Sequence, residues 1–267
     1  MQAFNFQSTL SLEQNTKMNP KILVGSPVNG MYDYCIEEYI AALKSLTYPN
    51  YDILLVDNSD GDEFFKKLQS MGIKVIKDKH FDEPRDRQVS GRNLLREKAL
   101  QQGYDYFLNL DQDVIPPKDI IERFLAHKRR VLTGIYFNYK QFTPKEKGSK
   151  EGIRHGQLFP TIWALLNQKG DLRQIQEHEL QPPRVIQIGL CGSGCLFIHK
   201  SVLQKITFRY SKENDDPTIN KLIFDDSYFC KDLINLKIPI YADTSMICKH
   251  LIRKKGWIWS DLTNRSS

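Results

Sequence analysis

Short apolar runs alternate with segments of helical periodicity between residues 21 and 137, and this alternation restricts the fold more than any other feature. The runs are KILVG (Lys21–Gly25), DILLVD (Asp52–Asp57), IKVIK (Ile73–Lys77), YDYFLNL (Tyr104–Leu110) and RRVLTGIYF (Arg129–Phe137). Strand and helix in this order predict parallel βαβ units. Because the runs are apolar throughout, we expect helices on both faces of the sheet.

The segments between these runs carry the helical signals. Apolar residues recur at helical spacing in Ile36, Tyr39, Ile40, Leu43 and Leu46. Further helices are expected at 63–70 and from about Arg87 to Gln102. We also expect Pro116 and Pro117 to open a helix, since proline suits a first turn.

The second half of the chain has a mixed pattern. A polar loop, Gln141–Gly156, precedes two strands around a turn in TIWALLNQKGDLRQI, and RVIQIGLCGSGCLFIHKSVL reads as strand, glycine turn, strand and helix start. FDDSYFCKDLINL predicts a helix with Phe229, Leu233 and Leu236 on its core face, and IPIYAD and SMICKHL predict strands. We therefore expect one α/β domain over 20–252 between an N-terminal tail (1–19) and a C-terminal tail (253–267). Its sheet should be mixed but mostly parallel, flanked by helices, with a smaller antiparallel portion within 138–252.

Composition narrows the class of protein. Lys and Arg number 38 against 32 Asp and Glu, and this net charge of +6 is too mild for a dedicated nucleic-acid binder. The five cysteines contain no CxxC pair, so reduced thiols are expected rather than a zinc site or disulfides. We see no signal peptide and no stretch near the roughly 20 apolar residues of a membrane span. A soluble, cytoplasmic protein is expected.

Carboxylates stand where two of the predicted strands end. Asp57 closes DILLVD, and Asp111 and Asp113 follow YDYFLNL. Ligands of open parallel sheets bind outside the carboxyl ends of the strands. Two carboxylates two residues apart suit Mg²⁺ or Mn²⁺, which take the rest of their shell from water and phosphates. Alternatively, Asp111 is a turn residue and Asp113 caps the next helix.

Several segments together resemble the GT-A glycosyltransferases, especially those of family 2. They are KILVGSPVNG with the following βαβ unit, QVSGRNLLREKALQQGYDYFLNLDQDV, GLCGSGCLFIHKSVL, FDDSYFCKDL and KHL, and the resemblance covers roughly residues 20–252. It implies a GT-A (Rossmann-like) fold with a nucleotide-sugar-binding half (20–137) and an acceptor-side half (138–252). Gly91 departs from the family pattern, where alanine is usual.

The resemblance implies a divalent metal, Mn²⁺ or Mg²⁺, as cofactor. Asp113 would hold the ion, with Asp111 assisting or touching the ribose. His250 matches the position of a third, histidine ligand, although a lone histidine on a strand is more often structural. Such an ion would act as a Lewis acid on the diphosphate of the donor.

The resemblance also places the nucleotide. Asp57 matches an aspartate that contacts it, and the loop after the first strand would line the base through Ser26, Pro27 and Val28. Arg92 would meet a phosphate or steady the aspartates; the alternative is an ordinary arginine on a solvated helix face.

The catalytic base is expected at the start of the helix in FDDSYFCKDL. Asp225 and Asp226 are the candidates, and the second acidic position, Asp226, usually holds the base in the family. A helix N-terminus favours an anion, so both residues could instead be simple first-turn charges.

The sequence therefore predicts transfer of a hexosyl-type sugar from a UDP-, GDP- or dTDP-sugar to a carbohydrate, lipid-linked or protein acceptor. The in-line attack that the resemblance implies predicts inverting chemistry, and a single addition is expected because the Gln-x-x-Arg-Trp motif of processive synthases is missing. Alternatives are a nucleotidyltransferase acting on sugar phosphates and a non-catalytic nucleotide- or carbohydrate-binding relative. Arg253, Lys254 and Lys255 with Trp257 and Trp259 suit either a membrane surface or a solvated tail.

Overall fold

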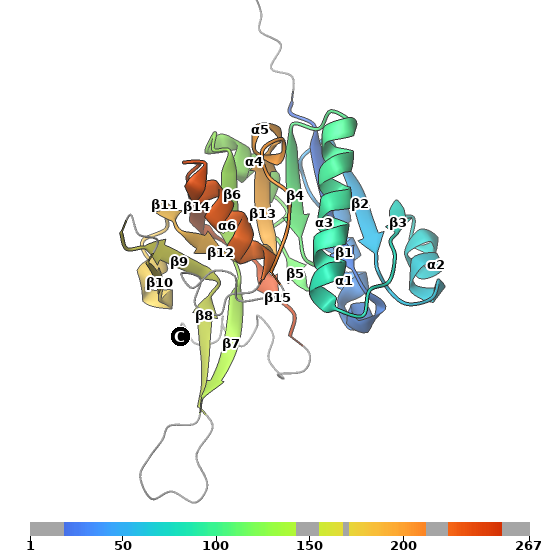
Figure 1. Cartoon of the computed structure of the whole chain (residues 1–267), viewed down its shortest axis with the longest axis horizontal. Coiled ribbons are helices and arrows are strands. Elements are labelled where there is room, and N and C mark those ends of the chain that lie inside the picture. The colour runs from blue at the N-terminus through green and yellow to red at the C-terminus, as the bar shows by residue number, and fades with distance from the viewer. Residues whose placement is uncertain (1–18, 143–154, 168–170, 212–223, 253–267) are drawn as a thin grey trace, which may run out of the picture.

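The computed structural model describes residues 19–142, 155–167, 171–211 and 224–252. Within these ranges the strands form one eight-stranded sheet and three small sheets, and helices lie against the large sheet (Figure 1). The predicted α/β class, with a mixed and mostly parallel sheet flanked by helices, is therefore confirmed.

The large sheet has the strand order β11-β14-β6-β13-β4-β1-β2-β3. Its parallel strands are β1 (Ile22–Val28), β2 (Tyr51–Asp57), β3 (Val75–Lys77), β4 (Tyr106–Leu110), β6 (Val131–Ile135) and β14 (Ile240–Ile247). β11 (Val185–Ile188) and β13 (Cys195–His199) run antiparallel to their neighbours. Because β13 separates β4 from β6, the parallel order is interrupted beside the end of β4.

Two hydrophobic cores explain why the central strands are apolar throughout. One face of the sheet carries α1 (Ile36–Lys44), α2 (Glu63–Ser70) and α4 (Ile120–Ala126); the other carries α3 (Pro84–Gln101), α5 (Lys200–Leu203) and α6 (Asp225–Asn235). In β1, Ile22 and Val24 belong to the first core, whereas Leu23 packs in the second with Leu95 of α3. Successive side chains of one strand thus fill opposite cores.

The small sheets are antiparallel, as expected for the second half of the chain. One contains β9 (Ile162–Leu165), β10 (Leu172–Gln174) and β12 (Leu190–Cys191). β7 (Phe137–Phe142) and β8 (His155–Pro160) form a hairpin that extends away from the body of the molecule (Figure 1). β5 (Val114–Ile115) pairs with β15 (Lys249–His250). Two 3₁₀ helices, η1 (Gly30–Cys35) and η2 (Glu177–Leu180), complete the described elements.

The first strand is longer than predicted, so its last three residues were wrongly expected in a loop. Ser26, Pro27 and Val28 belong to β1 and are buried. β1 pairs with β4 only as far as Gly25. Pro27 therefore lies where one side of the strand is unpaired, and this is where a strand tolerates a residue without an N–H.

Other element boundaries also differ from the predictions. α3 begins at Pro84 rather than Arg87, because the Glu83 side chain accepts a hydrogen bond from the Arg85 amide and caps the helix earlier. Pro116 and Pro117 do not open a helix; α4 begins at Ile120 after Asp119 as N-cap.

In the second half, Leu236 was wrongly placed on a core face. It follows the last residue of α6 and is 44% exposed, since the helix ends before its side chain can turn inward. The boundary between the two strands predicted from IPIYAD and SMICKHL is also different. Residues 240–247 form the single strand β14, whose register shifts between Ala242 and Ile247, and the short strand β15 follows at Lys249–His250.

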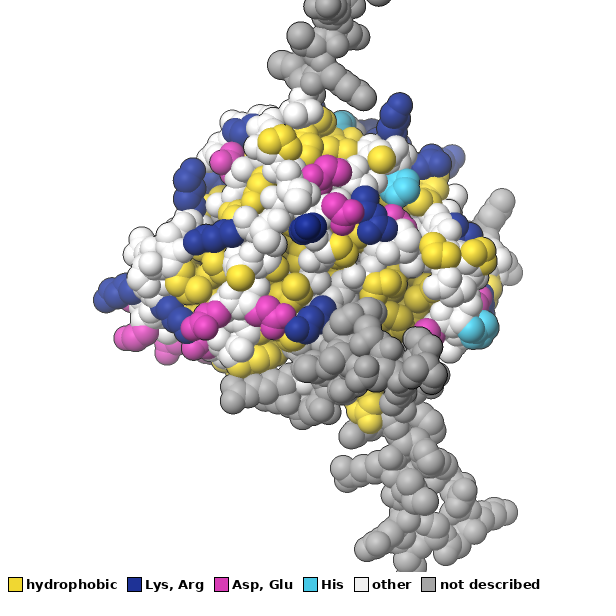
Figure 2. All heavy atoms as spheres, turned by 180° about the vertical axis from the view of Figure 1, so that it is seen from behind, with side chains coloured by type: hydrophobic (Ala, Val, Ile, Leu, Met, Phe, Trp, Pro, Cys, Tyr) yellow, Lys and Arg dark blue, Asp and Glu magenta, His cyan; other side chains and the backbone are white. Residues whose placement is uncertain are grey.

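Parts of the predicted tails and loop lie outside the described residues, namely 1–18, 143–154 and 253–267. The ends of the expected loop 141–156 belong to β7 and β8. None of the described helices combines the length and the apolar character needed to cross a membrane. On the face shown in Figure 2, the described basic and acidic side chains are interspersed rather than separated into areas of one sign.

Candidate active site

The predicted site residues gather where the parallel strands β1, β2 and β4 end. Val28 and Asp57 are register partners at the ends of β1 and β2. Asp111 follows β4, and its amide donates to the carbonyl of Gly194 at 2.9 Å, just before β13 begins. The site therefore lies at the carboxyl edge, beside the point where the parallel order is interrupted, which is the usual ligand position in such sheets.

Asp111 is held by donors from three parts of the chain. Its Oδ1 accepts from Ser26 Oγ at 3.3 Å, from Asn109 Nδ2 at 3.0 Å and from Arg92 Nη2 at 2.9 Å. Its Oδ2 accepts from Arg92 Nη2 at 3.2 Å. This carboxylate is oriented by protein donors rather than left free in a turn.

Arg92 joins Asp111 to the start of α6. Its Nη1 donates to Oδ2 of Asp225 while Nη2 binds Asp111, and the arginine is only 3% exposed. Burial opposes the charge, but the two carboxylates outweigh that effect and raise the pKa of Arg92. The alternative of a solvated helix-face arginine is thus wrong, because residue 92 faces the sheet. Both of its Nη groups contact carboxylates. These contacts account for the position of the guanidinium without a bound phosphate.

Asp226 differs from its neighbour Asp225. Asp225 is engaged by Arg92, whereas the hydrogen bond described for the Asp226 carboxylate comes from the Ser227 hydroxyl at 3.2 Å. Burial, followed by the charge of Asp225, raises the pKa of Asp226 to about 6, with Arg92 acting in the opposite direction. A carboxylate with a pKa near neutrality is suited to accept a proton.

His250 is brought to Asp113 by the short β5–β15 ladder. His250 pairs with Val114, and the Leu251 amide donates to the carbonyl of Asp113 at 2.8 Å. Nδ1 of His250 lies 2.7 Å from the Phe137 carbonyl, to which it must donate, so Nε2 is the nitrogen that faces Asp113 Oδ2 at 3.4 Å. Burial lowers the pKa of His250, but Asp113 more than offsets this and the pKa is raised.

These two side chains fit a divalent ion with an incomplete protein shell. A backbone carbonyl that fixes Nδ1 as donor and leaves Nε2 for a ligand is the usual second partner of a metal-binding histidine. No group of three or more His, Cys, Asp or Glu side chains within the described ranges is arranged to hold an ion by itself. Mg²⁺ and Mn²⁺ do not require one, because water and phosphate oxygens complete their coordination.

Gln112, between the two aspartates, has a function that the sequence analysis missed. It is buried and turned toward η1, where its Oε1 accepts from the Asn29 amide at 2.8 Å and its Nε2 donates to the Tyr32 carbonyl at 3.2 Å. The middle residue therefore ties the aspartate turn to the segment after β1. An amide between two carboxylates was the only signal of this in the sequence.

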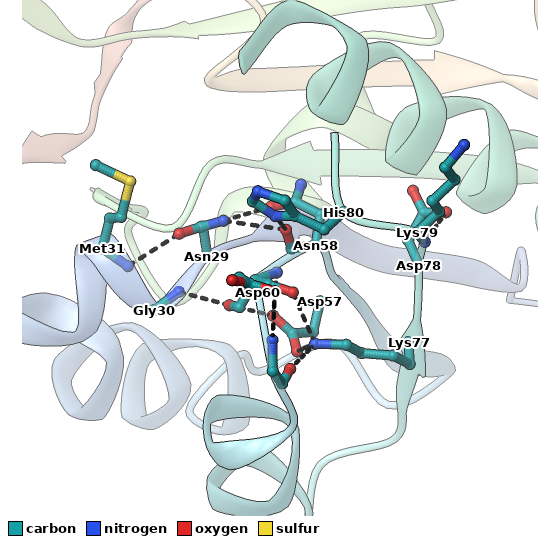
Figure 3. Close-up of polar contacts among 12 residues, drawn as sticks. Asn29, Gly30, Met31, Asp57, Asn58, Asp60, Lys77, Asp78, Lys79 and His80 are labelled. Carbon is teal, nitrogen blue, oxygen red and sulfur yellow. Dashed lines mark hydrogen bonds and ion pairs between the residues drawn. The ribbon is translucent and has the colours of Figure 1, made fainter. Parts of the chain in front are cut away.

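Asp57 is fully buried and paired within its own neighbourhood. Its Oδ1 accepts from the amide and hydroxyl of Ser59 at 2.9 and 2.5 Å, and its Oδ2 is 2.9 Å from Lys77 Nζ. Figure 3 shows Lys77 reaching across to this carboxylate, and Lys77 also donates to the carbonyls of Ser59 and Gly61. Asp57 thus shapes the loop after β2, and in this conformation its carboxylate has no exposed surface.

The loops after β1 and β2 are joined through Asn58. Its side-chain oxygen accepts from Asn29 Nδ2 at 2.8 Å, and its carbonyl accepts from His80 Nδ1 at 3.1 Å (Figure 3). The Gly30 amide donates to Ser59 Oγ at 2.8 Å. These hydrogen bonds form a polar surface at the edge of the sheet, here called the polar wall, from residues that the sequence analysis did not single out: Asn29, Gly30, Asn58, Ser59 and His80.

Gly91 explains how Arg92 reaches the strand ends. A Cβ at position 91 would lie 2.8 Å from Cβ of Pro27, which is too close for an ordinary contact. The start of α3 therefore approaches β1 closely only because residue 91 has no side chain. The departure from alanine is a packing requirement of this chain.

The predicted glycine turn lies against a buried tyrosine. A Cβ at Gly192 would be 2.0 Å from the hydroxyl oxygen of Tyr136, and one at Gly194 would be 2.8 Å from Cζ of the same ring. The Gly194 amide donates to the Tyr136 hydroxyl at 3.1 Å, and the ring meets His250 edge-on with centroids 5.3 Å apart. Tyr136 thus links the turn before β13 to the histidine, although the sequence showed it only as the end of an apolar run.

Comparison with known proteins gives one family match. A model described as glycosyl transferase family 2 matches residues 34–207, more than half of the chain. No curated protein matches the sequence.

The solved structures found as similar have low sequence identity and TM-scores below 0.5. A197 from STIV is 15% identical over 87% of this chain and 86% of that chain, with a TM-score of 0.44. S. aureus TarS is 14% identical with a TM-score of 0.47, over 85% of this chain but 35% of that chain. A TarS fragment in complex with UDP-GlcNAc is 15% identical, also with a TM-score of 0.47, over 85% and 55%. The chain therefore spans between about a third and just over half of these TarS chains.

Proposed function

The chain belongs to glycosyl transferase family 2, and on that basis we propose that it moves a sugar from a nucleotide-diphosphate sugar to an acceptor hydroxyl in a single, inverting addition. The observation that carries this proposal is the ion-pair chain Asp111–Arg92–Asp225, which runs from the end of β4 to the start of α6. It brings the aspartate turn and the acidic helix start to one edge of the sheet, as a two-substrate transfer requires.

On the donor side, we propose that Asp113 and His250 hold Mn²⁺ or Mg²⁺, with Asp111 beside them. The ion would supply Lewis-acid stabilisation of the negative charge on the diphosphate. The protein's own contribution is to orient the ligands: the Phe137 carbonyl directs Nε2 of His250 toward Asp113, and Arg92 holds Asp111.

The nucleotide itself is proposed to lie against the wall formed after β1 and β2. Four residues would support the nucleotide site from the protein interior rather than contact the base directly, because all four are buried: Ser26, Pro27, Val28 and Asp57. Asp57 and Lys77 would keep the loop at Ser59–Gly61 in place through the contacts of the lysine.

On the acceptor side, we propose Asp226 as the general base. Its carboxylate would take the proton of the acceptor hydroxyl as that oxygen attacks the anomeric carbon from the face opposite the diphosphate, which inverts the configuration. The raised pKa of Asp226, about 6, supports this role, and the engagement of Asp225 by Arg92 leaves Asp226 as the less constrained of the two.

We also propose how the domain is divided, which acceptors it uses and where it is located. Residues 20–137 would form the donor half and 138–252 the acceptor half of one domain. We further propose a carbohydrate, lipid-linked or protein acceptor and a cytoplasmic location. A nucleotidyltransferase is disfavoured, since the segment directly after β1, Asn29–Cys35, contains no Lys or Arg to form a phosphate loop.

A donor screen tests this function. UDP-, GDP- and dTDP-sugars are incubated with the protein and Mn²⁺, Mg²⁺ or EDTA, and released nucleoside diphosphate is measured. Asp113→Ala is expected to lower release about 100-fold or more by weakening the metal site. Asp119→Ala is the matched control, because that aspartate occupies the N-cap position of α4 without a side-chain cap hydrogen bond, and the ion pair described for it is with partly exposed Arg123 at 3.9 Å. If wild-type protein neither cleaves any donor nor binds one in a metal-dependent way, the proposal fails.

A further inference from the structure

Arg92 connects two segments of the chain that are far apart in sequence. Its partners Asp111 and Asp225 lie 19 and 133 residues away, and its two Nη groups divide between them. The first carboxylate follows β4 and the second is the first residue of α6. The contacts described for the start of α6 thus include one arginine that also binds the aspartate turn.

This arrangement is costly for the fold. Arg92 and Asp225 are 3% and 7% exposed, and two carboxylates share one guanidinium. Nε of Arg92 is buried, and it has no hydrogen-bond partner among the described residues. Buried ion pairs seldom stabilise a protein more than well-packed apolar residues do, because desolvation offsets the attraction. Folding alone therefore gives no reason to place these charges here.

Side-chain geometry shows what an arginine can do at this position that other residues cannot. A guanidinium presents several N–H groups in a rigid plane, so one residue can bind two carboxylates at fixed relative positions. The close approach of α3 to Pro27, which Gly91 permits, brings this plane between the two elements. The result is a rigid spacer between β4 and α6.

Building on the proposed function, we propose that Arg92 is a positioning residue that fixes α6, and with it Asp226, against the Asp111 turn. Arg92 would contact neither substrate; it would set the separation between the donor site and the base. In-line transfer depends on that separation, and a misplacement of about 1 Å can reduce a rate about 100-fold.

The charge environment of Asp226 supplies an independent readout. Among the described residues, the titratable groups that face it are Asp225 on its own helix, Arg92 on α3, the Tyr136 phenol and the Cys191 thiol. Burial raises the pKa of Tyr136, and Cys230 together with burial raises that of Cys191, so both are neutral near pH 7. Asp225 and Arg92 are left as the charges that act on the base, in opposite directions.

The decisive variant is Arg92→Lys, which keeps the charge but has a single Nζ that cannot span both carboxylates. We expect kcat to fall about 100-fold while the dissociation constant of the donor found in the screen changes by less than about threefold. Hydrogen exchange, measured by mass spectrometry, should become faster in residues 225–235 and stay unchanged in β1. Arg96→Lys is the matched control on the same helix, since the hydrogen bond described for the Arg96 side chain goes to the Leu203 carbonyl, and it should match wild type in each assay.

Asp225→Asn provides a second variant of nearly the same shape. Removing the charge that raises the pKa of Asp226 should move the acid limb of the kcat/KM profile to lower pH. If Arg92→Lys turns over within threefold of wild type and α6 exchanges normally, the proposal is overturned. If that variant does not fold, an unchanged acid limb and unchanged α6 exchange in Asp225→Asn overturn it instead. Wild-type inactivity would reject the proposed function alone, because the exchange measurements still decide the role of Arg92.

Discussion

Two buried carboxylate–cation clusters lie at the same edge of the sheet, and they are built differently. In the Asp57 cluster, Lys77 pairs with an aspartate 20 residues away and donates to two carbonyls of the same loop. In the Asp111 cluster, Arg92 pairs with carboxylates 19 and 133 residues away. The lysine side chain is 28% exposed, whereas that of the arginine is 4% exposed.

The difference shows that side-chain geometry and burial give similar ion pairs different structural roles. A flexible lysine with one charged atom is suited to closing a local loop, and its loss is partly compensated by water. A buried planar arginine can hold two distant elements in register, and no water replaces it.

Asp226→Asn should have the largest effect, because the proposed base is removed while the Arg92 cluster remains. We expect transfer to fall about 10³-fold, within the range for loss of general base catalysis. Donor binding, measured by calorimetry with Mn²⁺, should be retained. Equal loss of binding and transfer would contradict the role of Asp226 as base.

Arg92→Met should destabilise the fold most among the cluster variants, since it leaves Asp111 and Asp225 without their shared cation. We expect the free energy of unfolding in urea to fall by about 3–5 kcal/mol, as when one partner of a buried pair is removed. Arg96→Met, on the same helix, should cost about 1 kcal/mol through loss of the hydrogen bond described for Arg96, to the Leu203 carbonyl. Similar losses in the two variants would remove the distinction made for Arg92.

Lys77→Met should cost less than Arg92→Met. Asp57 keeps its two hydrogen bonds from Ser59 but loses its cation, and we expect about 2 kcal/mol in the same urea assay. Lys79→Met is the control two residues on, where the exposed lysine lies over the Phe81 ring. A loss for Lys77→Met as large as for Arg92→Met would show that local and long-range clusters matter equally.

The pH dependence of activity should be the mildest effect. Asp226 must be ionised to accept a proton, and burial raises its pKa to about 6. kcat/KM should therefore rise about tenfold between pH 5 and pH 7 and then level off. Assays after return to pH 7 separate this from irreversible inactivation, and a flat profile over that range would contradict the assignment.

Local patterns predicted most of the fold. Apolar runs and helical periodicity located the strands around Ile53 and Leu108 and the helices around Tyr39 and Leu95, because each pattern reports the burial of its own segment. Boundaries were missed where neighbours decide them. Pro27 belongs to a strand because β2 pairs with β1 as far as Val28, and it is tolerated because the pairing with β4 ends at Gly25; no local pattern contains either fact.

The site was predicted less evenly. Asp111 and Asp113 became candidates because both follow one strand, and Asp226 because it lies in the first turn of a helix. The inward turn of Gln112, the tyrosine beneath the glycine turn and the full burial of Asp57 were not predictable. Each depends on a side chain contributed by another element of the structure.

By itself the sequence determined the α/β order, the mostly parallel sheet and the carboxylates at its edge, since periodicity and strand-end chemistry are properties of short segments. The tertiary structure decided how those carboxylates are used. The side chain of Asp57 is buried against Lys77, whereas Asp111 is joined through Arg92 to Asp225. Only the packing of α3 against β1, which Gly91 permits, brings that arginine between segments so distant in the chain.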